Sequence, residues 1–348
     1  MHAHSTAEPR FWEYRGPADT AGLNAVRDAV REAERTVWMP GPDTVTDPGG
    51  RARFCLLAGI GDRVVGYTWA DWWTEVDGTR LYLVLGWVAP AWRRNGIGTA
   101  MLRWQEDQAA ELAATHGGAG PAVLGGNADD REHDTRALLL ANGYTVAFTV
   151  VHMTRDLTAE PAGTAPPARV ELPAGIELRP VTPGQHRDIH RAIEECFADN
   201  RTGYVARSLS EYRRDVRRRQ SDTGLWVVAW DGDQVAGVVI NEIRPNGTGL
   251  TPWVAVREPW RRRGLGRALM STGLARLSER GVTSTDLSTV AESPHGSLAL
   301  YQSLGYRVTR CQPRYRKPIS PCPDGPLHRP PQMFSREHTT PGTGSGRF

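Results

Sequence analysis

The chain has 348 residues, enough for about two domains of ~150 residues each. Its 39% hydrophobic and 23% charged residues are ordinary for a globular protein and exclude wholesale disorder. The formal net charge of +3 is too small to indicate a nucleic-acid partner by itself. Lys317 is the only lysine among 42 basic residues, a bias typical of a high-GC genome.

The sequence argues against a membrane protein, a secreted protein and a zinc-binding protein. No stretch approaches the ~18 uninterrupted apolar residues of a transmembrane helix, and the N-terminal segment MHAHSTAEPRFWEY lacks the apolar region of a secretory signal. Cys55, Cys196, Cys311 and Cys322 are far apart and show no CxxC spacing, which argues against a disulfide framework or a zinc site. We expect a cytoplasmic protein with no metal, no membrane contact and no nucleic-acid partner.

Strands and helices alternate along the first half of the chain. The segment FCLLAGIGDRVVGYTWADW, residues 54–72, has two apolar runs around a Gly/Asp turn, which predicts a β-hairpin. The other predicted elements are a strand around 11–14, a helix over 20–37, a strand over 81–88, a helix over 98–115 and a closing strand–helix–strand.

The second half repeats this order. Its predicted elements are a strand over 176–181, a helix over 183–198, a hairpin over 225–243, a strand over 250–256, a helix over 266–280 and a closing strand–helix–strand. The hairpins, the turns in GWVAPAWRRNGIGTAMLRW and VAVREPWRRRGLGRALMST, and the ends LLLANGYTV and LYQSLGYRV match in the same order, 162 to 171 residues apart. These matches indicate two copies of one α/β domain.

Composition suggests the domain boundaries. Residues 158–175, TAEPAGTAPPARVELPAG, are rich in Pro, Ala and Gly, which is typical of an extended linker. After residue 319 the chain has many Pro and Gly and few apolar residues, which predicts disorder. We expect an N-terminal domain over 1–157, a linker over 158–175, a C-terminal domain over 176–319 and a disordered tail over 320–348.

Each copy contains an R-x-x-G-x-G turn between a strand that ends in valine and an amphipathic helix. Free backbone amides at a helix N-terminus and the helix dipole bind phosphate groups. Glycines let the backbone approach such a ligand, and arginines supply countercharge and bidentate donors. The pattern occurs at residues 93–98 and again at residues 261–266, so it is much more specific than a single occurrence.

The spacing V-x4-R-x-x-G-x-G resembles the acetyl-CoA signature of the GCN5-related N-acetyltransferase (GNAT) superfamily. The resemblance covers roughly residues 10–157 and 175–319. It implies an α/β fold of two tandem GNAT-like domains, each a mixed, mostly antiparallel sheet flanked by helices. It also implies that the turn amides hold the pyrophosphate of coenzyme A and that the preceding strand pairs with the pantetheine arm. The cofactor-binding residues implied are Val254, Val256, Arg261, Arg262, Arg263, Gly264, Leu265, Gly266 and Arg267 in copy two, and Val88, Arg93, Asn95, Gly96, Ile97, Gly98 and Thr99 in copy one.

The two copies differ at the closing motif of the family. In copy two, Ala291-Glu292-Ser293 is followed by Leu298-Ala299-Leu300-Tyr301 and Gly305-Tyr306, which resembles that motif. The resemblance implies that Tyr301 protonates the departing thiolate, whereas copy one has Leu139 at the matching position. We therefore expect copy two to be catalytic and copy one to be non-catalytic. Whether copy one binds coenzyme A is left open.

An amine attacks a thioester only in its neutral form, so a proton acceptor is needed. The candidates are Glu242, on the second strand of the second hairpin, and Glu292; a solvated role for each is the alternative. Many family members carry an acid on the strand before the turn, but Leu250-Thr251-Pro252-Trp253-Val254 contains none.

Other residues have a structural and a functional interpretation. Trp69, Trp72 and Trp73 are candidates for an aromatic wall, although Trp72 and Trp73 must point to opposite faces of a strand. His295 is a candidate substrate contact or a solvated turn residue. The basic segment SEYRRDVRRRQ, with Arg213, Arg214, Arg217, Arg218 and Arg219, is best interpreted as a solvated helix face because few aromatic residues interleave the arginines.

The leading hypothesis is an acetyl-CoA-dependent N-acetyltransferase that acts on a primary amine of a small molecule, such as an amino sugar, an antibiotic or a biosynthetic intermediate. One alternative is acetylation of a protein lysine or N-terminus. Another is a non-catalytic acyl-CoA-binding protein, against which Tyr301 argues. A monomer and a homodimer are both compatible with the sequence.

Overall fold

The structure of the chain is a computed structural model. It describes residues 8–34, 39, 41, 55–118, 120–158, 171–198, 203–218 and 221–319. Three predictions lie wholly or mostly outside these residues: the disordered tail over 320–348, most of the linker, and the contribution of Arg219.

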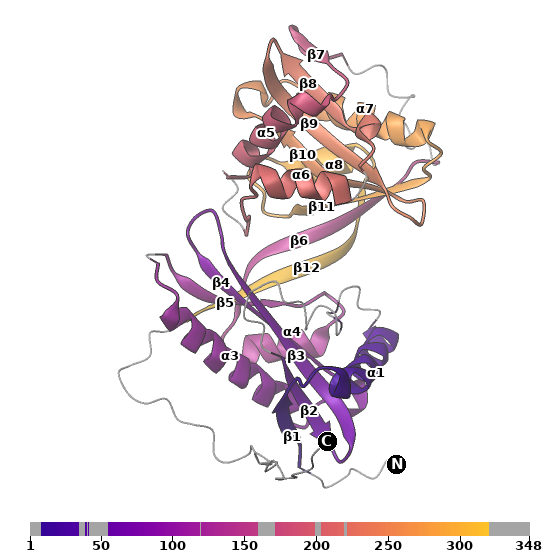
Figure 1. The fold of residues 1–348 in the computed structure, drawn as a ribbon. Helices are drawn as coiled ribbons and strands as arrows, with labels where there is room; N and C mark the ends of the chain where they lie inside the picture. The colour runs from indigo at the N-terminus through magenta and orange to yellow at the C-terminus, as the bar shows by residue number, and fades with distance from the viewer. Residues whose placement is uncertain are drawn as a thin grey trace, which may run out of the picture. The chain divides into compact units, whose positions relative to one another are not determined.

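The contacts of the chain divide it into two compact units (Figure 1). The first comprises Met1–Trp72, Tyr82–Gly118 and Pro318–Phe348, and the second comprises Trp73–Leu81 and Ala119–Lys317. The second unit therefore includes the end of the first sequence repeat as well as the second repeat.

The first unit is built on the predicted hairpin. Antiparallel pairs join Leu57 to Tyr67 and Ile60 to Arg63, as the two apolar runs around the Gly/Asp turn predict. The amphipathic helix α1 buries Leu23 and Val30 completely. The elements are β1 (Arg10–Glu13), α1 (Pro17–Glu34), β2 (Leu56–Ile60), β3 (Arg63–Thr74), β4 (Arg80–Val88), the 3-10 turn η1 (Pro90–Trp92) and α3 (Ile97–Thr115).

The second repeat forms two helical layers on one sheet. Its elements are β7 (Ile176–Leu178), the 3-10 turn η2 (Pro183–Gln185), α5 (His186–Ala198), α6 (Leu209–Arg218), the 3-10 turn η3 (Thr223–Leu225), β8 (Val227–Asp231), β9 (Gln234–Ile243), β10 (Gly249–Val256), the 3-10 turn η4 (Glu258–Trp260), α7 (Leu265–Glu279), β11 (Ser284–Val290), α8 (Ser297–Ser303) and β12 (Arg307–Pro318). Helices α7 and α8 pack in one core cluster with Val239 and Leu287. Helices α5 and α6 pack in another with Val238 and Ile240. Because neighbouring strand residues point to opposite faces, these clusters lie on opposite faces of the sheet.

The last strands of the two repeats are interleaved in the second unit. The first repeat ends with β5 (Ala122–Asn127), α4 (His133–Ala141) and β6 (Thr145–Asp156). Strand β12 lies between β5 and β6, and β6 lies between β12 and β11. Both β11 and β12 pair antiparallel with β6, so the crossover through α8 leaves a gap of one strand that β6 fills. Val151 and Met153 of β6 complete the core around α7 and α8.

The element order confirms the predicted repeat. From the hairpin onward, both copies run through two antiparallel strands, a third strand, a 3-10 turn, a helix, a strand, a helix and a final strand. The sheet is mixed, since β10 pairs parallel with β11, whereas β6 pairs antiparallel with β11 and β12, and β7, β8, β9 and β10 pair antiparallel in succession. The interleaving of β6 and β12 is not apparent from the repeat alone.

Candidate active site

The two R-x-x-G-x-G segments form the same backbone turn. In each copy a 3-10 turn follows the strand, and the α-helix begins after a glycine in the left-handed conformation. These glycines are Gly96, with a φ of 78°, and Gly264, with a φ of 81°. In the part of the chain that the structure describes, Arg94 and Arg262 are the non-glycine residues with positive φ. The sequence repeat is thus a structural repeat at this turn.

The first arginine of each turn bonds to the protein itself. The Arg261 Nε donates to the carbonyl oxygen of Val256 at 2.8 Å, and the Arg93 Nε donates to that of Val88 at 2.9 Å. Each arginine therefore fastens the helix entrance to the end of the preceding strand. In copy two, Arg262 and Arg263 are exposed, and these are the side chains placed to offer countercharge to an anion.

The turn of copy two has the properties of an anion cradle. The first N–H groups of an α-helix have no partner within the helix, and those of α7 follow directly on Gly264. A Cβ built on Gly264 would meet no protein atom within 4 Å, so the space in front of the backbone is free for a ligand. These features fit the pyrophosphate of coenzyme A.

Strands β10 and β11 part beside this turn. Their parallel pairing involves Gly249 and Leu250, whereas Trp253 to Val256 pair with β9 on the other side. The register of β10 shifts between Leu250 and Trp253, which is the signature of a bulge. The β11-facing edge around Val254 and Val256 is therefore available for main-chain pairing with an extended ligand arm.

Tyr301 lies on α8, close to the turn. A Cβ on Gly266 would lie 3.5 Å from Leu300 Cδ2, so α8 packs against the entrance of α7. The Tyr301 side chain is 6% exposed, and its ring centroid lies 6.1 Å from that of Tyr306. Among the described residues no hydrogen bond engages its hydroxyl. Burial, with a smaller contribution from Tyr306, raises the pKa of Tyr301 well above its usual value, so the hydroxyl keeps its proton.

In the first copy the matching residue is buried but carries no proton to give. Leu139 on α4 is 4% exposed. A Cβ on Gly126 would lie 2.8 Å from Leu139 Cδ2, so the leucine packs closely against β5. The asymmetry between Tyr301 and Leu139 is thus present in equivalent helices.

The two candidate proton acceptors lie in different settings. Glu292 follows β11, and its Oε2 accepts a hydrogen bond from the backbone N–H of Thr149 at 2.9 Å. That oxygen therefore holds β6 against β11. Glu242 pairs with Leu250 where β10 and β11 begin to part. It lies two residues after Ile240 on β9, so the two side chains share the face of the sheet that α5 covers.

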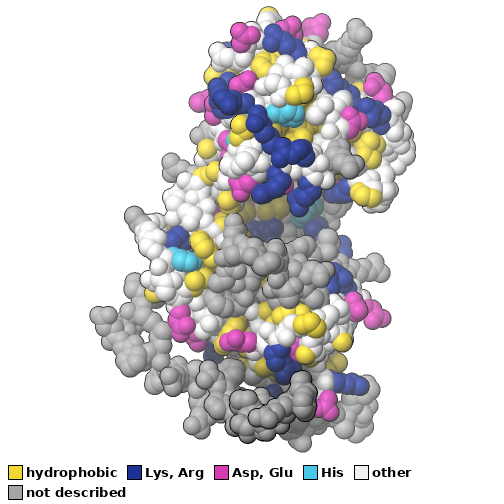
Figure 2. Space-filling view, viewed as in Figure 1, with side chains coloured by type: hydrophobic (Ala, Val, Ile, Leu, Met, Phe, Trp, Pro, Cys, Tyr) yellow, Lys and Arg dark blue, Asp and Glu magenta, His cyan; other side chains and the backbone are white. Residues whose placement is uncertain are grey.

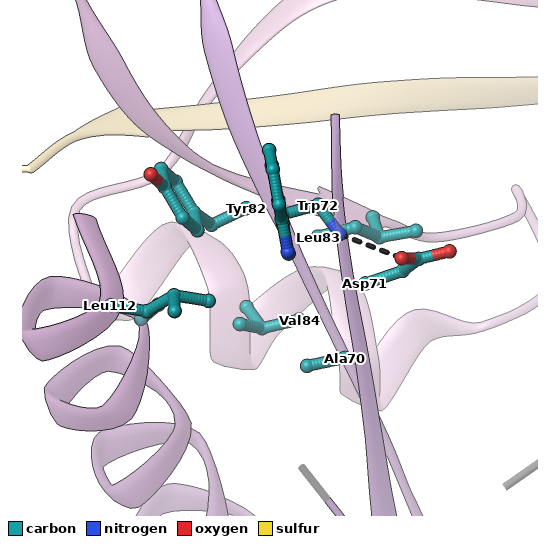
Figure 3. A pocket seen from close by; sticks show the side chains of 8 residues that line it. Ala70, Asp71, Trp72, Tyr82, Leu83, Val84 and Leu112 are labelled. Atoms are coloured by element: carbon teal, nitrogen blue, oxygen red, sulfur yellow. Dashed lines mark hydrogen bonds between the residues drawn. The ribbon is translucent and has the colours of Figure 1, made fainter. Parts of the chain in front are cut away.

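Two tryptophans of the candidate aromatic wall, Trp69 and Trp72, lie in the first unit, whereas Trp73 is assigned to the second. Trp69 is buried. Trp72 packs against His116, with ring centroids 4.1 Å apart, and against Tyr82 at 6.4 Å. Figure 3 shows Trp72 and Tyr82 at the edge of a hollow between β3, β4 and α3. These contacts give Trp72 a packing role there.

The basic segment forms α6 and presents arginines to solvent. Arg213, Arg214, Arg217 and Arg218 are exposed, whereas Tyr212 is buried. Figure 2 shows basic side chains gathered over the part of the second unit that carries α6. His295 is also exposed, in the loop before α8.

One group of residues beside the bulge was missed by the sequence analysis. Trp253 packs edge-on against Phe197, with centroids 5.0 Å apart, and the Arg207 guanidinium lies 4.2 Å from its ring centroid. The Tyr204 hydroxyl donates to Glu194 at 2.8 Å. No local pattern links these residues, because they come from α5, the segment before α6, and β10.

Two negative findings apply to the described ranges. No group of three or more His, Cys, Asp or Glu side chains there is placed to hold a metal ion. None of the helices in those ranges combines the length and apolar character needed to cross a bilayer.

Comparison with known proteins agrees with this geometry. The profile of the family described as "Acetyltransferase (GNAT) family" matches residues 23–118 and 187–306. A mycothiol acetyltransferase from Geodermatophilus obscurus is 28% identical over 298 residues, covering 81% of this chain and 86% of that protein.

Solved structures show the same fold. A GCN5-related N-acetyltransferase from Sphaerobacter thermophilus aligns with a TM-score of 0.68 at 24% identity, covering 91% of this chain and 98% of that one. A tandem GNAT protein from the clavulanic acid biosynthesis pathway aligns with a TM-score of 0.61 at 20% identity, covering 90% and 99%. Because the family profile covers more than half of the sequence and matches both repeats, the chain belongs to the GNAT family of acetyltransferases, as an enzyme with two tandem copies of the GNAT domain.

Proposed function

We propose that this enzyme transfers an acetyl group from acetyl-CoA to a primary amine of a small molecule, and that the second repeat carries the reaction. The observation that carries the proposal is the placement of three features within the second unit. An anion cradle follows Gly264, β10 has an unpaired edge, and the protonated Tyr301 lies on the helix that packs against the cradle.

Each group then has a defined task. Acetyl-CoA supplies an activated acyl group as a thioester. The amides after Gly264 and the exposed Arg262 and Arg263 hold its pyrophosphate. The edge of β10 around Val254 aligns the pantetheine arm, and the backbone there provides donors for the developing oxyanion. Tyr301 gives its proton to the departing sulfur, and Glu242 or Glu292 is the acceptor for the proton of the amine.

The first repeat keeps the turn but not the acid. The amides after Gly96 are available to bind coenzyme A, whereas Leu139 cannot protonate a leaving group. We therefore assign it a binding or supporting role, with Val88, Asn95, Ile97, Gly98 and Thr99 around its turn.

A small acceptor is supported by the relatives. Several of them are named mycothiol acetyltransferase, a name that points to a small molecule rather than to a protein. Acetylation of a protein lysine or N-terminus and non-catalytic acyl-CoA binding remain the alternatives.

The test is thiol release from acetyl-CoA by the purified full chain with a panel of small amines and lysine-containing peptides. We expect amine-dependent release with small amines and a mass increase of one acetyl group on the amine. Release with peptides alone would favour the protein-acetylation alternative. Tight acetyl-CoA binding without release would favour the non-catalytic one.

A further inference from the structure

A connected polar network lies on the face of the second unit opposite α7 and α8. The strands β11, β6 and β12 place Leu287, Val151 and Met153 in the core beneath those helices. Their alternate residues therefore point to the other face. There, Ser288 Oγ lies 2.8 Å from His152 Nδ1, and Arg310 Nη2 lies 3.0 Å from His152 Nε2.

The hydrogen bonds favour one tautomer of His152. Its Nε2 lies 3.0 Å from Arg310 Nη2 and 3.4 Å from Gln312 Oε1. An arginine can only donate and its contact is the shorter one, so we infer that Nε2 accepts from Arg310 and that Nδ1 carries the proton, which it donates to Ser288. Burial, and then the nearby Arg310, lower the pKa of His152, in agreement with a neutral ring. The exposed Ser288 hydroxyl consequently has its own hydrogen left to donate to a ligand.

The acids around this face are already paired. Asp129 lies 3.3 Å from Arg310. Asp286 accepts from Thr154 at 2.7 Å and from Arg244 at 2.5 Å. On the same strand as Arg310, Arg316 donates to Glu75.

Arg314 differs from these arginines. Its guanidinium donates to the amide oxygen of Gln312 at 2.9 Å, and in the part of the chain described here no carboxylate lies within ion-pair distance of it. Burial, and then the positive charge of Arg310, lower the pKa of Arg314 to about 10. The Arg314 guanidinium is half-buried, and among the described residues its other N–H donors have no protein acceptor. An anion bound there would use these donors and offset the repulsion between Arg314 and Arg310.

We propose that Arg314, with Ser288 and the flanking Arg310, forms a binding site for a carboxylate or phosphate group, and that the amine acceptor of this enzyme carries that anionic group. The first part rests on the network itself. The second part rests on the proposed acetyl transfer. Helices α7 and α8 cover one face of β11 and β6, so the acceptor would approach from the opposite face of these strands, which carries the network. The exposed arginines of α6 on that face would attract an anionic acceptor.

The test compares Arg314→Gln with Lys317→Gln. The second variant is the control, because it also removes one positive charge from β12, at a residue whose ammonium lies over the ring of Tyr144. Binding is measured without turnover, as the rise in unfolding temperature caused by inorganic phosphate relative to sodium chloride of equal ionic strength. Saturating coenzyme A is present to occupy the turn after Gly264. Phosphate should stabilise the wild type and Lys317→Gln but not Arg314→Gln.

Turnover is measured with matched amines, namely glucosamine 6-phosphate against glucosamine and 6-aminohexanoate against hexylamine. We expect the anionic member of a pair to be preferred. Arg314→Gln should raise its KM by about 10–100-fold and leave the neutral member unchanged. Arg314→Lys keeps the charge but loses the fork of donors, so its KM for the anionic amine should lie between those of the wild type and Arg314→Gln. This variant replaces Arg314→Gln in the test if Arg314→Gln does not fold.

The outcomes separate the two proposals. Phosphate stabilisation that depends on Arg314, with no amine acetylated, would support the anion site and contradict the proposed function. Acetylation of neutral and anionic amines alike, with KM and phosphate effects identical in wild type and Arg314→Gln, would overturn the anion site and leave the proposed function standing.

Discussion

At the scale of single residues, Tyr301 and Leu139 distinguish the two copies. Both are buried on the helix that precedes the last strand, so packing does not separate them. The hydroxyl of Tyr301 does, because it carries a proton at the position where the family's closing motif implies an acid, and Leu139 does not.

Tyr301→Phe keeps the ring and its contact with Tyr306, so the fold should survive. Loss of a positioned acid costs ~10²–10⁴-fold in rate, and we expect the low end because a thiolate is a good leaving group. The loss should appear in kcat, with the KM for acetyl-CoA unchanged, as measured by thiol release with a saturating amine.

The pH dependence provides the control. Burial raises the pKa of Tyr301, so its proton is present throughout the range from pH 7 to 9, and the loss should be the same at both values. An unchanged kcat in Tyr301→Phe, with chemistry shown to limit the rate, would return Tyr301 to a packing role and reopen copy one as the active half.

The two glutamates should respond differently to the same substitution. Glu292→Gln keeps an amide oxygen that can accept from Thr149, so the junction of β6 and β11 should hold. Glu242→Gln removes the carboxylate beside the parting of β10 and β11. We expect kcat to fall by about 10²-fold in Glu242→Gln and by much less in Glu292→Gln. The reverse order would assign the proton acceptor to Glu292.

At the scale of elements, the strand–turn–helix unit is the part of the fold that both copies preserve. The left-handed glycine, the left-handed arginine two residues before it, and the arginine bonded to the strand carbonyl recur in both. The turn is therefore held by its own backbone and first arginine.

Gly264→Val and Gly96→Val are matched variants of these turns. Both glycines have a φ near 80°, and a Cβ added to either would have no protein atom within 4 Å, so both variants should lose about 1–3 kcal/mol of stability to the same backbone strain. Only Gly264→Val should also lose turnover and raise the KM for acetyl-CoA. Equal loss of turnover in both variants would show that both turns serve the reaction.

At the scale of the whole molecule, β6 belongs to the first repeat in sequence and to the core of the second in space. It pairs with β11 from Ser284 to Val290 and with most of β12. Burying Val151 and Met153 contributes about 1.5–3 kcal/mol each, and the backbone pairing adds to this. The boundary predicted at 158–175 thus separates sequence repeats whose strands remain joined.

Residues 176–319 produced alone should consequently fail to unfold cooperatively and should release no thiol. The control is a full chain cut within 158–175, which retains β6 and should keep both properties. Circular dichroism during heating and the thiol assay measure the outcome. A fragment 176–319 that is stable and fully active would show that β6 is dispensable.

The sequence by itself determined the α/β class, the two copies, the two R-x-x-G-x-G turns and the asymmetry between Tyr301 and Leu139. Each of these features depends on a short segment, because periodicity, glycine position and residue identity determine local structure over a few neighbouring residues. The turn at 261–266 could be recognised because strand, arginine, glycine and helix follow one another directly.

The tertiary structure alone decided which contacts join distant segments. It placed β6 beside β11, bonded Glu292 to Thr149, and gathered Phe197 and Arg207 around Trp253. It also left Arg314 without an acidic partner among the residues that the structure describes. His152 and Ser288 are 136 positions apart, and no local pattern encodes their approach. Local preferences fix the elements, but the gap left by each crossover was filled by a strand from the other repeat, and that choice depends on packing across the folded chain.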